Sequence, residues 1–181
     1  MKNWFFICSA LMLFWACNAQ DPISREYRCW FLFSSTDHPS SILITTIQSP
    51  GSYARVTTHG DGKTTPRHVL VRSNDPSVAD EDNIIRSAIE NELRYELGAS
   101  NDIGLIIGCT NFDGPRAYDA ACPNCSVLKA LNWTGNRQQV ICSRCNRTYL
   151  LDTGNIISGD EGESLRRYSC SFDGTTIRAW N

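Results

Sequence analysis

The chain contains two Cys-x-x-Cys pairs, Cys122-Pro-Asn-Cys125 and Cys142-Ser-Arg-Cys145, separated by 16 residues. Cysteine thiolates bind Zn²⁺ and iron, and two such pairs on separate loops can supply the four corners of one tetrahedral site. The spacing is typical of zinc sites. We therefore predict a metal site at Cys122, Cys125, Cys142 and Cys145. Two disulfides, or four buried thiols, are the alternatives.

The residues around the pairs fit this prediction. Asn146 follows the second pair, where the chain often needs a residue that tolerates positive φ, and Pro123 stiffens the first loop.

A closed four-cysteine site leaves no coordination position for water, which disfavours metal-assisted hydrolysis. Ser164 and the Ser40-Ser41 pair have no nearby His–Asp arrangement in the sequence. We therefore name no catalytic residue and favour a protein that is not an enzyme.

The N-terminal segment has the features of an export signal. Lys2 precedes an apolar run of 12 residues, Trp4 to Trp15, which is shorter than the roughly 20 residues needed to span a bilayer. We predict a signal peptide over residues 1–16. The segment Leu13-Phe14-Trp15-Ala16-Cys17 resembles the lipobox of bacterial lipoproteins, with Phe14 and Trp15 bulkier than the strict pattern prefers.

The lipobox resemblance implies that Cys17 becomes the lipidated N-terminus of the mature protein. Residues 17–28 would then form the lipidated end and a tether to the folded part. The implied location is the bacterial cell envelope, with the outer membrane favoured, and the membrane would be reached through the lipid. Plain secretion with cleavage nearby is the alternative.

Composition describes one ordinary globular domain. Removal of residues 1–16 from the 181-residue chain leaves 165, enough for a single core. The net charge is −2, and loss of Lys2 with the signal makes it −3. The absence of a basic run argues against a nucleic-acid partner. The sequence identifies no protein partner.

Hydrophobic patterning predicts a mainly β fold with one amphipathic helix. Helical spacing of apolar residues, with Gly98 as the stop, predicts a helix over 80–97. Turn residues at 60–63 and at Asp173-Gly174 predict two hairpins. The predicted strands are apolar or β-branched runs at 29–33, 42–47, 53–58, 68–72, 104–109, near 127–133, and at 138–142, 147–151, 165–172 and 175–180.

Three further cysteines, Cys29, Cys109 and Cys170, lie in apolar or strand-like runs. An odd number left over in an exported protein indicates at least one free thiol. We favour burial of these residues as small hydrophobic side chains. A disulfide of Cys170 with either Cys29 or Cys109 is the alternative.

The second half of the chain resembles a Rieske domain, the small β fold that carries a [2Fe–2S] cluster. The segments that carry the likeness are Tyr118–Pro123, Val140–Cys145, Leu165–Tyr168 with Gly159, the Asp173-Gly174 hairpin and, more loosely, Tyr149–Gly154. The likeness spans roughly residues 104–181. More narrowly, the run Asn111–Asp119 before Cys-Pro-Asn-Cys is similar to that of Bacteroidetes lipoproteins that join such a domain to a β-rich first half and a helix.

This resemblance implies a single Rieske-like β-sandwich or barrel over residues 29–181. Within it, a small two-loop metal-binding subdomain would occupy about 118–150. A Rieske cluster, however, is held by two cysteines and two histidines. Asn124 and Cys145 stand where the histidines would be, and His38, His59 and His68 all lie upstream of both loops.

What remains is a four-cysteine site, which suits one Zn²⁺ or one rubredoxin-like iron, with an all-cysteine [2Fe–2S] cluster as a further alternative. Two functions follow. The favoured one is a membrane-tethered, non-enzymatic binding or structural module that contains structural zinc. The alternative is an electron-transfer protein with an iron or [2Fe–2S] centre.

Overall fold

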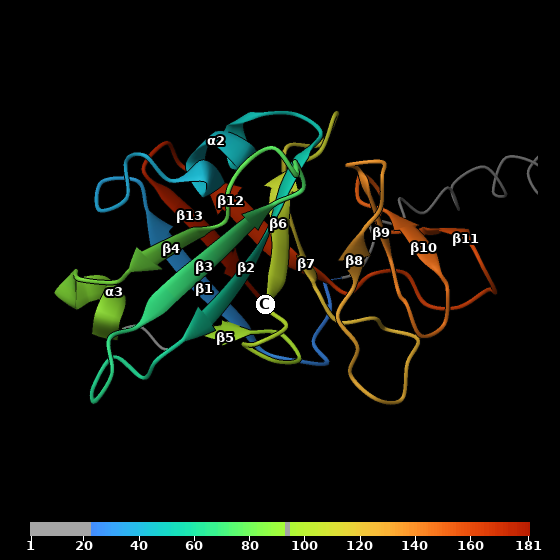
Figure 1. Cartoon of the computed structure of the whole chain (residues 1–181), viewed down its shortest axis with the longest axis horizontal. Coiled ribbons are helices and arrows are strands. Elements are labelled where there is room, and N and C mark those ends of the chain that lie inside the picture. Colours follow the sequence, from blue (N-terminus) through green and yellow to red (C-terminus); the bar gives the residue numbers. More distant parts are fainter. Residues whose placement is uncertain (1–22, 93–94) are drawn as a thin grey trace, which may run out of the picture.

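The computed structural model of the chain describes residues 23–92 and 95–181. These residues form a nine-stranded and a four-stranded antiparallel sheet with two short helices (Figure 1). The first part contains β1 (Cys29–Ser34), α2 (Ile42–Gln48), β2 (Ser52–His59), β3 (His68–Ser73), β4 (Glu81–Ile84), α3 (Ala88–Glu92) and β5 (Glu96–Leu97). The second contains β6 (Leu105–Cys109), β7 (Pro115–Asp119), β8 (Asn132–Trp133), β9 (Gln139–Ile141), β10 (Thr148–Leu150), β11 (Ile156–Ser158), β12 (Arg167–Phe172) and β13 (Thr176–Trp180).

The large sheet has the strand order β4-β3-β2-β6-β7-β12-β13-β1-β5. Its two predicted hairpins are confirmed, with β2 antiparallel to β3 and β12 antiparallel to β13. Gly174 has a φ of 94° in the second turn, a conformation that glycine adopts without strain. The sheet curls around one core, since Phe31 of β1 and Val69 of β3 belong to the same cluster of buried side chains.

The central strands of this sheet are buried on both faces because successive side chains point to opposite sides. All five residues of β6 are buried. Leu105 and Ile107 enter the core inside the curled sheet, whereas Ile106 enters a second core together with Tyr53 and Tyr118. The four-stranded sheet, of order β11-β10-β9-β8, packs over this second core beside the large sheet (Figure 1).

The predicted strand at 42–47 is wrong, because these residues form helix α2. The Ser41 hydroxyl caps the helix by accepting from the amide of Leu43, and the Glu81 carboxylate accepts from the amide of Ile42 at 2.7 Å. The helical turn buries Leu43 and Ile47 in the main core. Capping and burial therefore outweigh the strand preference of this β-branched run.

The predicted helix at 80–97 is also wrong. Residues Glu81–Ile84 pair with β3, and among the described residues of this segment only Ala88–Glu92, which form α3, are helical. Ile89, one of the apolar residues with helical spacing, is 75% exposed, whereas the Glu90 side chain is buried and accepts from the amide of Ser34 at 2.8 Å. The residues with helical spacing thus lie partly in α3, partly in β5 and partly between elements, and the expected amphipathic helix over 80–97 is not formed.

The other predicted strands are confirmed, apart from the region near 127–133, where only Asn132–Trp133 forms a strand. Strands β4, β5 and β11 were not predicted, and β7 was anticipated only through the resemblance of Tyr118–Pro123 to the Rieske strand before the first loop. Cys29 and Cys109 are buried, Cys170 is partly buried, and all three are free thiols.

Within the described residues, neither helix has the length and apolar character needed to cross a bilayer. The predicted signal peptide, Cys17 and the start of the tether lie outside the described residues.

Candidate metal centre

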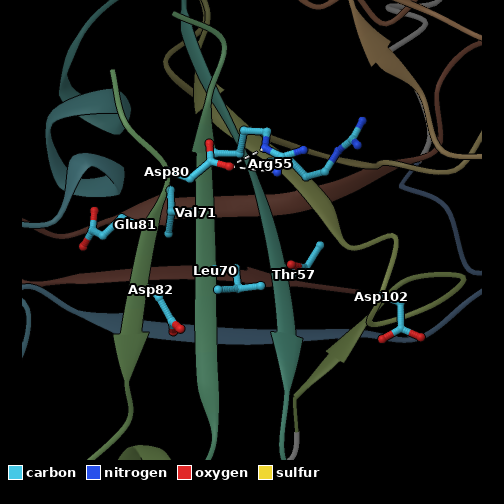
Figure 2. A pocket seen from close by; sticks show the side chains of 9 residues that line it. Arg55, Thr57, Leu70, Val71, Asp80, Glu81, Asp82 and Asp102 are labelled. Carbon is cyan, nitrogen blue, oxygen red and sulfur yellow. Dashed lines mark hydrogen bonds and ion pairs between the residues drawn. The ribbon is translucent and has the colours of Figure 1, made fainter. Parts of the chain in front are cut away.

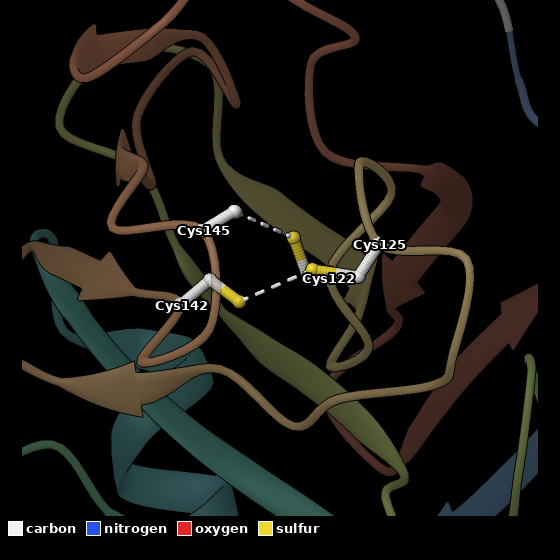
Figure 3. Close-up of side chains that lie close together, drawn as sticks. All are labelled: Cys122, Cys125, Cys142 and Cys145. Atoms are coloured by element: carbon white, nitrogen blue, oxygen red, sulfur yellow. Dashed lines mark hydrogen bonds between the residues drawn. The ribbon is translucent and has the colours of Figure 1, made fainter.

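The structure brings the four predicted cysteines into one cluster (Figure 3). Their sulfur atoms all lie within 4.8 Å of one another. Two contacts join the two loops: Cys122 Sγ lies 3.7 Å from Cys145 Sγ, and Cys125 Sγ lies 3.6 Å from Cys142 Sγ. The first and third cysteines are buried, and the other two are partly exposed. The cluster could therefore hold a metal ion.

Strand β7 positions the first loop. The strand is followed by the buried pair Ala120 and Ala121, and Ala121 forms an isolated bridge with Ala130. The amide of Cys122 then donates to the carbonyl of Lys129 at 2.8 Å, which closes the loop on itself. The first cysteine pair is thus held at the end of a central strand of the large sheet.

The second loop is a tight turn between β9 and β10. The amide of Cys142 donates to the carbonyl of Arg147 at 3.0 Å, and the amide of Asn146 donates to the carbonyl of Cys142 at 2.8 Å. Asn146 has a φ of 57° and is the only described non-glycine residue with positive φ. The sequence-based expectation for this position is therefore confirmed.

The spacing of the sulfurs fits a single tetrahedral ion. Metal–sulfur bonds of about 2.3 Å place the ligand sulfurs about 3.8 Å apart, close to the 3.7 and 3.6 Å of the two contacts between the loops. A disulfide would require about 2.05 Å, and every cysteine in the described residues is a free thiol. A two-iron cluster inserts bridging sulfides between its pairs of cysteines and needs more space than this cluster offers.

Neighbouring groups act unequally on the thiols. Burial raises the pKa of Cys125 to about 12, with the adjacent thiols adding to the effect. Burial acts in the same direction on Cys145, but hydrogen bonds from the backbone and guanidinium of Arg147 outweigh it and lower the pKa of that thiol to about 6. The same guanidinium donates to the carbonyls of Asp160 and Glu161, both at 3.0 Å. Arg147 therefore joins the cluster to the segment after β11.

Asn124, at one of the positions where the Rieske pattern has a histidine, holds the first loop in place through its side chain. Its amide nitrogen donates to Tyr149 Oη at 2.9 Å and to the carbonyl of Glu163 at 2.7 Å, and its amide oxygen accepts from the Glu163 amide. Tyr149 Oη lies 3.5 Å from Cys122 Sγ. Gly162 permits this approach, because a Cβ there would lie 2.3 Å from Asn124 Oδ1.

The supporting residues Asn124, Arg147 and Tyr149 were not assigned these roles from the sequence. Arg147 directly follows the second pair and Asn124 lies inside the first, so proximity to the cysteines was the available signal. Their partners at 160–163 are distant in sequence and could be found only from the fold.

Comparison of the chain with family models, with curated proteins and with solved structures gave no match. The interpretation of the centre therefore rests on its own geometry and on the chemistry of four converging thiols.

Proposed function

We propose that the protein is a non-enzymatic, Rieske-like module whose four cysteines bind one structural Zn²⁺. The observation that carries this proposal is the convergence of all four sulfur atoms within 4.8 Å, at distances suited to one tetrahedral ion. Zinc needs no further ligand in such a site, and four-cysteine zinc sites are closed and structural. Cys122, Cys125, Cys142 and Cys145 would hold the ion.

A structural role is supported by where the cysteines lie. Cys122 and Cys142 belong to the second core, together with Tyr53 and Ile106 of the large sheet. The small sheet consists of strands of only two or three residues, which are marginal without additional stabilisation. A bound ion would cross-link its two loops and contribute directly to the free energy of folding.

Substitution of a single ligand tests this role. Cys142→Ser should release the zinc and lower the melting temperature by roughly 5–10 °C, because losing the ion removes several kcal/mol. Cys170→Ser is the matched control, since Cys170 lies outside the cluster and should leave the zinc content unchanged. Zinc content is measured by elemental analysis and melting by circular dichroism. A Cys142→Ser protein that melts like the wild type would rule out a structural metal.

We further propose that the module is anchored to the cell envelope by lipid on Cys17, with the outer membrane as the favoured location. The lipobox-like segment before Cys17 supports this. In bacterial cells, the wild-type protein should sediment with membranes and partition into detergent, whereas Cys17→Ser should be recovered in the soluble fraction. Equal membrane recovery of both proteins would contradict the anchor.

A second candidate is electron transfer through one iron bound by the same cysteines. Cys125 lines a surface depression of about 640 Å³ together with Pro123, Asn124 and Leu128, so a partner could approach one ligand closely. A four-cysteine iron site has the same tetrahedral geometry as the zinc site. Iron content with reversible reduction would favour this candidate over zinc.

A further inference from the structure

A second group of metal-binding side chains lies on the outer face of the large sheet. His59 on β2 and His68 on β3 are directly opposite each other in the antiparallel register. Strand β4 pairs with the other edge of β3, and its Asp82 lies on the same face as His68. Three adjacent strands thus contribute one side chain each to a single spot on the surface.

These side chains are close enough to share an ion. One ligand atom from each lies within 4.8 Å of the other two. The two imidazole rings stack with their centroids 4.5 Å apart, and His68 Nδ1 lies 2.8 Å from Asp82 Oδ1. The side chains of His68 and Asp82 are 21% and 51% exposed, and His59 is exposed, so an ion could enter from solvent.

We propose that His59, His68 and Asp82 form a second metal site, one that takes a divalent transition metal such as Ni²⁺, Cu²⁺ or Zn²⁺. Imidazole nitrogen and carboxylate oxygen are ligands for these ions. The backbone hydrogen bonds of β2, β3 and β4 fix the three Cα positions, so little ordering of the chain is needed when an ion binds.

Three protein ligands leave coordination positions open, unlike the closed four-cysteine cluster. Asp82 also lines a hollow of about 300 Å³ on the same face, together with Arg55, Thr57 and Leu70 (Figure 2). This hollow gives water or a small ligand room beside the ion. The second site is therefore suited to exchangeable binding rather than to holding the fold together.

The two sites are distinguishable by the metals they prefer. Thiolates select zinc and iron, whereas nitrogen and oxygen ligands also suit Ni²⁺ and Cu²⁺. A protein whose cysteines already hold Zn²⁺ can therefore be titrated with Ni²⁺ to report on the histidine site. The geometry of the histidine site does not depend on the cysteine cluster, because its residues lie on the outer face of β2, β3 and β4. Its test rests on the proposed function in one respect, since the cysteines are filled with Zn²⁺ before Ni²⁺ is added.

The test is calorimetric titration with Ni²⁺ of the untagged, reduced protein after addition of one equivalent of Zn²⁺. The wild-type protein should bind one Ni²⁺ per chain, and His59→Ala and Asp82→Asn should each weaken binding at least tenfold. Asp80→Asn is the matched control, because Asp80 is a neighbouring carboxylate that pairs with Arg72 and is not a ligand.

The control should bind Ni²⁺ as the wild type does, and circular dichroism should show the same fold in every variant. Absence of Ni²⁺ binding by the wild type would overturn the proposal. Binding that His59→Ala and Asp82→Asn leave unchanged would overturn it as well, because the ion would then occupy another site.

Discussion

At the scale of single residues, the four-cysteine cluster depends on side chains that are not ligands. Asn124 fastens the first loop to Tyr149 and to the backbone of Glu163. Arg147 fastens the second loop through the carbonyls of Asp160 and Glu161. Each loop is thus held in place by hydrogen bonds, which reduces the conformational freedom that metal binding must remove.

Asn146 provides a prediction at this scale. Its positive φ is strained for most side chains but acceptable for asparagine and glycine. Asn146→Ala should therefore lower the free energy of unfolding by about 1–2 kcal/mol, whereas Asn146→Gly should change it little. Urea denaturation of the zinc-bound proteins measures both. Equal stability of the alanine and glycine variants would show that backbone strain at this turn is unimportant.

The cysteine pairs and the turn at Asn146 were recognisable in the sequence because each Cys-x-x-Cys turn is a local feature. The spacing within a Cys-x-x-Cys pair and the residue after it reflect a turn of a few residues. The pairing of His59 with His68 was not predicted. It depends on the register of the β2–β3 hairpin, although the two predicted strands and the turn between them were already recognisable in the sequence.

At the scale of elements, Asp152 joins the small sheet to the large one. It follows β10, and its carboxylate accepts from Tyr53 Oη on β2 at 3.0 Å. The carboxylate also accepts from the backbone and the side chain of Asn111, at 3.0 and 2.6 Å. Burial alone would raise the pKa of Asp152, but these hydrogen bonds outweigh it and lower the pKa below its usual value of 3.8.

The lowered pKa predicts how this contact depends on pH. A carboxyl group with a lower pKa in the folded state stabilises the fold fully above its unfolded pKa of about 4, and this contribution is lost as the pH falls through the folded value. Asp152→Asn should lower the free energy of unfolding by about 1–3 kcal/mol at pH 7, because an amide cannot accept all three hydrogen bonds.

The difference between wild type and Asp152→Asn should stay constant from pH 5 to pH 8 and shrink below about pH 4. Urea unfolding at a series of pH values measures this difference. Asp102→Asn, which changes an exposed carboxylate, is the control and should show no comparable loss. A difference that grew as the pH fell would contradict the assigned role of Asp152.

The two elements that were predicted wrongly share a physical cause. The residues of α2 are β-branched and favour a strand, but Ser41 and Glu81 cap the helix and its apolar side chains enter the core. The segment 80–97 has helical spacing, yet Glu81–Ile84 completes the edge of the large sheet. In both cases contacts with residues distant in sequence outweigh local preference. The two hairpins were predicted well because each joins strands that are consecutive in the sequence through a connection rich in turn residues.

At the scale of the whole molecule, the large curled sheet carries the small sheet and its cysteine cluster on one side. The second core, which includes Tyr53, Ile106 and Tyr118 of the large sheet, is continuous with the buried cysteines Cys122 and Cys142. The histidine group lies elsewhere, on the outer face of β2, β3 and β4. The molecule therefore places the four-cysteine cluster and the histidine group on different parts of the fold, in line with the separate roles proposed for them.

The central claim is that the cysteine cluster holds one structural zinc ion. The most direct measurement is metal content by elemental analysis, together with a visible absorption spectrum, on protein purified without oxygen. The account predicts one zinc per chain bound at the cysteines and no visible absorbance, with the zinc lost in Cys142→Ser. Iron with charge-transfer bands, or an oxidised cluster without metal, would contradict it.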